Sequence, residues 1–252
     1  MLFSIITINL NNSEGLKKTI ESVISQDHKD LEYIVIDGNS SDDSVSVIES
    51  YKDNIDYTIS EPDSGIYDAQ NKGILEATGK YLLFLNSGDV LSEKNTLSSV
   101  AALVTDASFY YGNLIMNKEG KKETHVAPTK IDLDFMLNST FWHPCVFIKA
   151  DLFKKYGLYR TDFKIAGDYE FFIRCLLKPN VSCDHINRFI SVFDGSGVSN
   201  DSKLAALLTE ERERAWHLNI SEPIFESLKK HNVFSRSKYS KIISTIQKFR
   251  GK

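Results

Sequence analysis

Short apolar runs alternate with helical patterns along the first 90 residues. Residues 2–8 are a continuous apolar run of strand length, and beyond Asn12 or Ser13, which can cap a helix, apolar positions recur on one helix face. The alternation predicts strands at 2–8, 31–36, 57–60 and 81–85 and helices at 12–26, 42–51 and 66–77. Gly79 is expected to end the last of these helices. Apolar strands that alternate with helices are typical of a parallel sheet covered on both faces.

Polar residues gather where each of these predicted strands ends. The clusters occupy residues 7–12, 37–43, 61–65 and 86–89. Because parallel strands present their carboxyl ends at one edge of a sheet, and ligands of such sheets bind there, we expect the clusters to form one ligand site.

The second half of the chain has a less regular pattern. Extended segments are predicted at 109–116, 124–126, 145–148 and 181–193, and helices at 151–156, 168–177, 203–218, 224–230 and 239–249. A polar loop is expected at 117–122. The whole pattern predicts an α/β fold with a mostly parallel central sheet, helices on both faces and a helical C-terminal extension.

Composition narrows the class of protein. A net charge of −4 over 252 residues gives no electrostatic reason to expect a nucleic-acid partner. Three irregularly spaced cysteines argue against a disulfide framework or a structural zinc site and favour a cytoplasmic compartment. The first ten residues lack the basic flank of a signal peptide, and no stretch is long and apolar enough to span a bilayer.

Charge is divided unevenly along the chain. Residues 228–252 carry eight Lys or Arg and no Asp or Glu, so the remaining residues carry a net charge of −12. Such a basic tail suits peripheral docking on the anionic inner face of a membrane, at roughly 1 kcal/mol per basic residue. A solvated tail is the alternative interpretation, and the sequence does not decide between the two.

Three carboxylates stand where chemistry can occur. Asp37 follows a buried strand and can accept hydrogen bonds from a base or ribose, or it can cap the next helix. Asp89 can give an oxygen ligand to a divalent cation on a diphosphate, although Ser-Gly-Asp is also a common turn. Asp168 can act as general base on an acceptor hydroxyl, or it can be a first-turn acid favoured by the helix dipole, which is what we expect of Glu170.

Three further residues give weaker indications of a functional role. Trp142 and His143 precede a predicted strand and can form a sugar or acceptor surface, whereas a lone His is more often structural. Lys72 can neutralise a phosphate, or it can be an exposed helix lysine. No phosphate loop, dinucleotide fingerprint or nucleophile elbow occurs, so dehydrogenase and hydrolase functions lack their signatures.

Six short segments follow one another in a recognisable order and spacing. They are SIITINLN at 4–11, VIDGNSSD at 35–42, SEPDSGIYDAQNKG at 60–73, ATGKY at 77–81, LNSGD at 85–89 and AGDYE at 166–170. In this order the chain resembles the bacterial family 2 glycosyltransferases with a GT-A fold, of the kind that builds cell-surface polysaccharide. The resemblance covers roughly residues 2–200, and several motifs in order are far more specific than any one alone.

The resemblance implies a role for each matching position. The residues that would bind the donor nucleotide, its diphosphate and its sugar are Thr7, Asn9, Asp37, Asp63 and Lys72. Asp89 would hold a divalent cation, Mg²⁺ or Mn²⁺. Asp168 would deprotonate the acceptor hydroxyl, which then attacks with inversion of configuration. The glycine-rich segment 195–199 matches one near the end of the family's catalytic domain.

The implied enzyme moves a sugar from a nucleotide-sugar donor, UDP-linked by preference, to a glycan or lipid-linked glycan. We expect a GT-A domain at 1–200, with a nucleotide-binding half at 1–90 and an acceptor-binding half at 91–200, and an extension at 201–252. Two departures affect the site. The family's usual Pro-x-Tyr-Asn is INLN at 8–11, and Asp89 is the only acid left in the metal motif.

Two other functions are compatible with parts of the pattern. A sugar-nucleotide-binding protein without transfer activity would explain the thinned metal motif, but Asp168 argues against it. A nucleotidyltransferase would need basic residues after the first strand, and residues 9–15 contain none.

Overall fold

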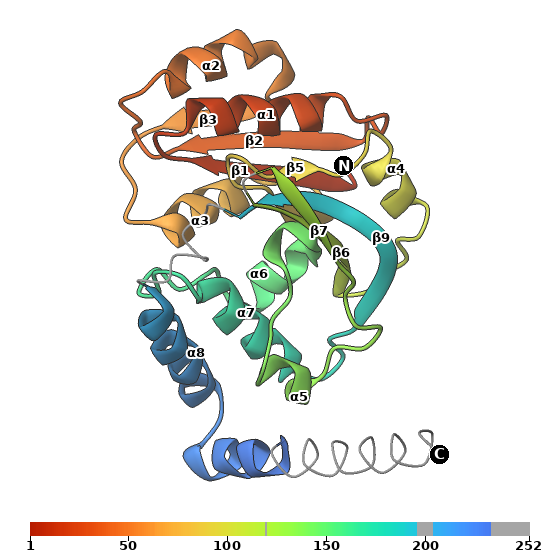
Figure 1. Cartoon of the computed structure of the whole chain (residues 1–252), viewed down its shortest axis with the longest axis vertical. Coiled ribbons are helices and arrows are strands. Elements are labelled where there is room, and N and C mark those ends of the chain that lie inside the picture. Colours follow the sequence, from red (N-terminus) through yellow and green to blue (C-terminus); the bar gives the residue numbers. More distant parts are fainter. Residues whose placement is uncertain (119, 196–203, 233–252) are drawn as a thin grey trace.

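The computed structural model describes residues 1–118, 120–195 and 204–232 (Figure 1). Within these residues, nine strands form one sheet in the order β3-β2-β1-β4-β8-β6-β9-β5, and β7 pairs with β6. The strands are β1 Phe3–Asn9, β2 Leu31–Asp37, β3 Tyr57–Ser60, β4 Tyr81–Phe84, β5 Val90–Leu91, β6 Phe109–Lys118, β7 Lys121–His125, β8 Val146–Lys149 and β9 Cys183–Asp194.

The first half of the sheet is parallel, as the sequence predicted. β1 pairs in parallel with β2 from Phe3 opposite Leu31 to Asn9 opposite Asp37, and β4 and β3 extend this arrangement on either side. β8 then joins β4 antiparallel, while β6 and β9 run with the first four strands. Six of the nine strands described here therefore point the same way, which confirms a mostly parallel sheet.

Helices cover both faces of the sheet (Figure 1). The helical elements are α1 Ser13–Ile24, α2 Ser44–Ser50, η1 Lys52–Asn54, α3 Ile66–Glu76, α4 Thr96–Ala101, α5 Leu133–Met136, η2 His143–Cys145, α6 Ala150–Tyr156, α7 Gly167–Leu176 and α8 Ala205–Asn219. Residues 222–232 are also helical. None of the helices described in residues 1–118, 120–195 and 204–232 has the length and apolar character needed to cross a bilayer.

Alternating side chains of the central strands feed two separate cores. On β1, Ile5 joins the core under α1, α2 and α4, whereas Ile6 joins the core formed with α3, α6 and α7. All seven residues of β1 are buried, which explains why the first apolar run shows no alternation with polar residues. Asn12 caps α1, because its Oδ1 accepts the backbone N–H of Gly15 at 3.0 Å.

The structure gives Gly79 a different role from the expected helix stop. α3 ends at Glu76 with an extended Ala77 as its C-cap, and Gly79 is not among the glycines with positive φ. A Cβ at Gly79 would lie 2.5 Å from the backbone nitrogen of Ser4. Gly79 is therefore required for the close approach of this turn to β1.

Several elements of the second half were not predicted, or have different bounds. β5, α4 and α5 have two to six residues each, which is too short for a periodic pattern to appear. The polar loop expected at 117–122 is narrower, because β6 and β7 pair as a hairpin as far as Lys118 opposite Lys121. The helix predicted at 239–249 lies outside the described residues.

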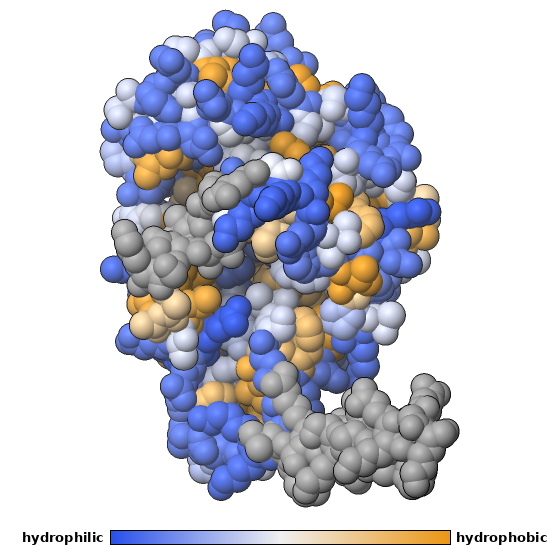
Figure 2. Space-filling view, in the orientation of Figure 1, coloured by the Kyte–Doolittle hydropathy of each residue, from blue (hydrophilic) through white to orange (hydrophobic). Residues whose placement is uncertain are grey.

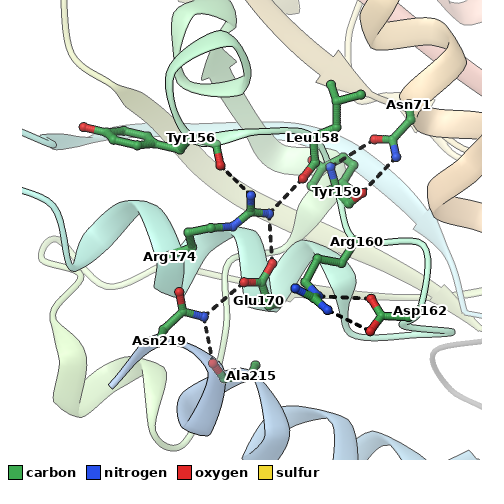
Figure 3. A network of polar contacts seen from close by, with 10 residues as sticks. All are labelled: Asn71, Tyr156, Leu158, Tyr159, Arg160, Asp162, Glu170, Arg174, Ala215 and Asn219. Atoms are coloured by element: carbon green, nitrogen blue, oxygen red, sulfur yellow. Dashed lines mark hydrogen bonds and ion pairs between the residues drawn. The ribbon is translucent and has the colours of Figure 1, made fainter. Parts of the chain in front are cut away.

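A buried ion pair ties α7 to α8 and to the loop after α6 (Figure 3). Glu170, which is 2% exposed, contacts Arg174 at 2.9 Å. The Arg174 guanidinium also donates to the carbonyls of Tyr156 and Leu158, and Asn219 of α8 donates to Glu170 at 3.0 Å. The expectation that Glu170 is only a first-turn acid was therefore incomplete, since its charge is buried and paired.

We predict that Arg174→Met lowers the free energy of unfolding by roughly 3 kcal/mol, because it leaves the buried Glu170 charge uncompensated. The measurement is urea denaturation. The control is Lys17→Met, which breaks an exposed ion pair with Glu21 and should cause no resolvable change in the free energy of unfolding. Adding Glu170→Gln to Arg174→Met should recover part of the loss. A single variant as stable as the wild type would contradict the prediction.

Candidate active site

Two adjoining cavities open beyond the carboxyl ends of the parallel strands. The first, of about 440 Å³, is lined by residues that include Asn9, Asp63 and Asp194. The second, of about 330 Å³, is lined by residues that include Asp168 and His143. The residues that line both cavities are Ile66, Asn86, Asp89 and Phe193. The two cavities therefore form one cleft, and Figure 2 shows that the mostly hydrophilic face seen there is hollowed near its middle.

Asp37 is fully buried and is bonded to Asn9, which lines the first cavity. Its Oδ1 accepts hydrogen bonds from Asn9 Nδ2 at 2.8 Å and Ser40 Oγ at 2.6 Å, and its Oδ2 accepts from Ser60 Oγ at 2.6 Å and the Ser40 N–H at 2.9 Å. Burial alone would raise the pKa of Asp37, but the bonds from Ser40, Ser60 and Asn9 lower it. Asp37 therefore joins the ends of β1, β2 and β3 as an anion.

Asn9 has one buried polar atom that its neighbours leave unused. Its Nδ2 is bound to Asp37, whereas its Oδ1 is buried without a hydrogen-bond partner in the part of the chain that the structure describes. Because Asn9 lines the first cavity, this oxygen can accept a hydrogen bond from a ligand there. Thr7 is different, since its side chain lies in the core with its Oγ1 3.1 Å from the Tyr33 hydroxyl.

Asp63 lines the first cavity, whereas Lys72 does not. Asp63 Oδ1 accepts the Gly65 N–H at 2.9 Å, and a Cβ at Gly38 would lie 2.4 Å from Asp63 Oδ2. A side chain at position 38 would therefore displace this carboxylate. Lys72 forms a 2.8 Å ion pair with Glu61, a contact that raises the pKa of Lys72.

Asp89 meets a second carboxylate that the sequence analysis did not find. Asp89 is 4% exposed, and its Oδ1 accepts the backbone N–H of Asp194 at 2.9 Å. Burial raises the pKa of Asp89 to about 7, and the charge of Asp194 adds to this effect. Gly88 permits the approach, since a Cβ there would lie 3.0 Å from Asp194 Oδ2.

These two acids fall short of a complete protein metal centre. Within the described residues, no group of three or more His, Cys, Asp or Glu side chains could hold a metal ion. A pair of adjacent carboxylates, one of them buried, is nevertheless a donor set that suits a hard divalent cation whose other ligands are phosphate oxygens and water. Asp194 lies 105 residues from Asp89, at the end of β9, so no local motif could have linked them.

Asp168 is held in the second cavity by a tyrosine from the other half of the chain. The Tyr67 hydroxyl donates to Asp168 Oδ1 at 2.9 Å. Burial, together with the charge of Asp168, raises the pKa of Tyr67 well above its usual value, so this hydroxyl keeps its proton. The backbone approaches closely here, because a Cβ at Gly167 would lie 2.8 Å from the Tyr67 ring.

Trp142 and His143 line the second cavity. The His143 ring stacks on Phe84 with centroids 4.8 Å apart, and its Nε2 lies 2.9 Å from the Tyr159 hydroxyl. Burial lowers the pKa of His143 against the opposing charge of Asp168, so the imidazole is neutral at pH 7. A neutral, stacked ring is suited to contact a sugar and not to bind an anion.

Arg212 of α8 brings a positive charge into the second cavity. Its guanidinium lies over the Tyr169 ring, 5.1 Å from the centroid, and its Nε is buried without a hydrogen-bond partner among the described residues. Arg212, Tyr67 and Asp194 were not among the predicted site residues. Tyr67 lies in the matched segment 60–73, which was a usable signal, whereas nothing local distinguishes Arg212 from the other charged residues of α8.

This fold and cleft define the GT-A class of glycosyltransferase, in which strands of a mostly parallel sheet end at a nucleotide-sugar site. The model of the family "Glycosyl transferase family 2" matches residues 4–166. The chain belongs to this family, which confirms the resemblance noted from the six motifs.

Curated relatives support the same assignment. A PGL/p-HBAD biosynthesis glycosyltransferase of Mycobacterium tuberculosis is 30% identical over 207 residues, which cover 79% of each chain. An uncharacterized glycosyltransferase of the same species is 32% identical over 217 residues, which cover 83% of this chain and 81% of the relative.

Solved structures share the fold at lower identity. S. aureus TarS superposes with a TM-score of 0.62 and 21% identity, over 77% of this chain and 37% of TarS. A TarS 1–349 structure contains UDP-GlcNAc, with a TM-score of 0.61, 20% identity, and coverage of 77% of this chain and 58% of that one. The mannosyltransferase PcManGT from Pyrobaculum calidifontis, in complex with GDP-Man and Mn²⁺, has a TM-score of 0.58 and 16% identity, over 76% of this chain and 56% of PcManGT.

We predict that Tyr67→Phe lowers kcat for sugar transfer roughly 10- to 100-fold, because Asp168 loses the bond that orients it. Tyr51→Phe is the matched control, since the Tyr51 hydroxyl bonds only the exposed Glu21 outside the cleft. The thermal midpoint should change little in either variant. Equal kcat values for the two variants would show that the Tyr67 bond is dispensable.

Proposed function

We propose that the protein is an inverting, metal-assisted transferase that moves a sugar from a UDP-sugar to a hydroxyl of a glycan or lipid-linked glycan, in cell-surface polysaccharide biosynthesis. The observation that carries the proposal is the position of Asp168. Its carboxylate, oriented by Tyr67, lines the cavity that shares Asp89 with the neighbouring cavity. Direct displacement at an anomeric carbon requires a base on one side of the reacting centre and a nucleotide pocket on the other. Asp168 and the first cavity would provide these two parts on either side of Asp89.

The first cavity is the proposed donor nucleotide site. Asn9 Oδ1, buried and unpaired among the described residues, would accept an N–H of the base, and Asp63 would border the ribose and diphosphate. Asp37 supports the pocket from below through its four hydrogen bonds. A role of Thr7 and Lys72 in binding would have to be indirect, through Tyr33 and Glu61 respectively. The TarS complex with UDP-GlcNAc supports a UDP-linked donor, since it shares this fold.

The charge of the leaving diphosphate requires compensation. Asp89 and Asp194 would hold a divalent cation, Mg²⁺ or Mn²⁺, and the cation would stabilise the negative charge that develops on the departing phosphate. Arg212 would add a second positive charge from the other side of the cleft. The Mn²⁺ in the PcManGT complex supports the cation on this fold.

Asp168 would accept the proton of the acceptor hydroxyl as that oxygen attacks the anomeric carbon. Tyr67 stays protonated and donates to the same carboxylate, so it fixes the orientation of the base without competing for the proton. Trp142 and the neutral His143 would contact the acceptor sugar. The anomeric configuration inverts, because attack and departure occur on opposite faces in a single displacement.

A third cavity adjoins the acceptor side and is mostly apolar. It holds about 130 Å³ and shares Ser139, Thr140, Phe141 and Trp142 with the second cavity. A cavity of about 150 Å³ can hold a benzene molecule, so this one accommodates a ring-sized apolar group. The cavity supports an acceptor whose sugar is attached to an apolar moiety, as in a lipid-linked glycan.

Peripheral docking on the inner face of the membrane is part of the same proposal. The basic residues that would mediate it lie mostly at 233–252, outside the described residues. Such docking would be useful for a lipid-linked acceptor, because it would bring the enzyme to the membrane surface where the acceptor lies.

Donor binding tests the first half of the proposal. We predict that UDP with Mn²⁺ raises the thermal midpoint of the wild type, and that Asp89→Asn loses at least tenfold in UDP affinity when Mn²⁺ is present but not when it is absent. Asp106→Asn, in an exposed ion-paired residue, serves as the control. Identical UDP affinities of Asp89→Asn and the wild type in Mn²⁺ would remove Asp89 from the cation site.

Acceptor preference tests the second half of the proposal, the apolar acceptor. We predict that phenyl β-D-glucopyranoside binds at least threefold more tightly than the methyl glycoside, measured by ligand-observed NMR, because the phenyl ring leaves water for the apolar cavity. Ala127→Leu, which narrows this cavity, should abolish the difference, and Ala102→Leu, at the exposed residue that follows α4, should preserve it. No preference in the wild type would contradict the apolar acceptor.

A further inference from the structure

Glu211 is an acidic residue of α8 that is buried against the start of α7. Only 4% of its surface is exposed. Its carboxylate accepts three backbone N–H groups, from Lys164 at 2.7 Å, Ile165 at 3.0 Å and Ala166 at 2.9 Å. A carboxylate that is removed from water needs such donors, and three of them fix its position.

The three donors immediately precede the helix that carries the proposed base. α7 begins at Gly167, and Asp168 is its second residue. The start of a helix has N–H groups without intrahelical partners and a partial positive charge, so a carboxylate there stabilises the helix start in the observed position. The N-cap residue of α7, Ala166, has no polar side chain that could accept these N–H groups. Glu211 performs it from 45 residues away in the sequence.

Two other residues of α8 bond side chains in the first turn of α7. Trp216 Nε1 donates to the Tyr169 hydroxyl at 2.8 Å, and Asn219 Nδ2 donates to Glu170 at 3.0 Å. Residues 164–166 before Asp168 and Tyr169 and Glu170 after it are thus bonded to α8, which lies beside α7 in Figure 1. Asp168 itself remains free to line the cavity and to meet Tyr67.

We infer that Glu211 is a positioning residue for Asp168, so that α8, beyond the segment that the family model matches, is part of the catalytic machinery. The inference rests on the proposed role of Asp168 as the base. Tyr67 orients the carboxylate of Asp168 from the side of α3, and Glu211 holds the backbone of residues 164–166, directly before α7, from the side of α8. A displacement of about 1 Å at a catalytic group can cost roughly 100-fold in rate, so the loss of either support should lower kcat.

The test compares two Glu→Gln variants on one helix in the full-length chain. Glu213 is exposed and bonded to Lys229 at 3.3 Å, so Glu213→Gln is the matched control for Glu211→Gln. The rate of UDP release is measured from whichever of UDP-glucose, UDP-galactose and UDP-GlcNAc the wild type uses fastest, with octyl β-D-glucopyranoside as acceptor. We expect Glu211→Gln to lower kcat roughly 10- to 100-fold with UDP affinity within about twofold of the wild type, and Glu213→Gln to leave both unchanged.

A double-variant cycle separates positioning from general stability. If Glu211 acts through the geometry of Asp168, the kcat losses of Glu211→Gln and Tyr67→Phe will be smaller in combination than their product, because both disturb one carboxylate. Multiplicative losses, or a Glu211→Gln kcat within threefold of the wild type, would overturn the inference. Where Glu211→Gln does not fold, Glu211→Asp, shorter by one methylene, is measured in the same cycle. An active Asp168→Asn variant would instead remove the proposed base itself.

Discussion

The hydrogen bond between Tyr67 and Asp168 is the contact on which the cleft depends. It joins α3 to α7 across 101 positions of sequence. The bond forms only because Gly167 lets the backbone of α7 pass close to the Tyr67 ring, and because burial keeps the tyrosine protonated. Without this bond the sheet and its two cores would remain, but the Asp168 carboxylate would lose the contact that fixes it relative to α3.

Three acids in or next to the cleft, Asp37, Asp89 and Asp168, have different surroundings, and their proposed functions differ accordingly. The Asp37 carboxylate accepts four hydrogen bonds, which keep it ionised and connect the ends of three strands. Asp89 is almost fully buried, and the charge of Asp194 beside it further disfavours its ionised form. Of the three carboxylates, Asp89 would therefore be stabilised most by a bound cation. Asp168 retains access to the cavity and has Tyr67 as its side-chain partner, which leaves one carboxylate oxygen for a substrate. Identical side chains thus support different chemistry, and the environment of each one decides which.

Sequence patterns predicted the parallel half of the fold closely, because each buried strand and each helix there follows from local periodicity and caps. β3 has the predicted bounds, and α1 is capped by Asn12, one of the two predicted caps. The motifs also located Asp89, Asp168, Asn9 and Asp63 in the cleft. Sequence reasoning failed where a function depends on a distant partner. Arg212 and Glu211 lie in a helix without a recognisable motif, and Asp194 lies 105 residues from Asp89. Lys72 matched a motif, yet it is paired with Glu61 and does not line the first cavity.

The most direct test of this account replaces the base without altering its shape. Asp168→Asn preserves the size of the side chain and can still accept the Tyr67 hydrogen bond, but it cannot take a proton from an acceptor. Sugar transfer and UDP binding are measured on the same preparation. The account predicts a loss of roughly 100- to 10,000-fold in kcat with UDP affinity unchanged. An Asp168→Asn variant that keeps more than about a tenth of the wild-type kcat would contradict it.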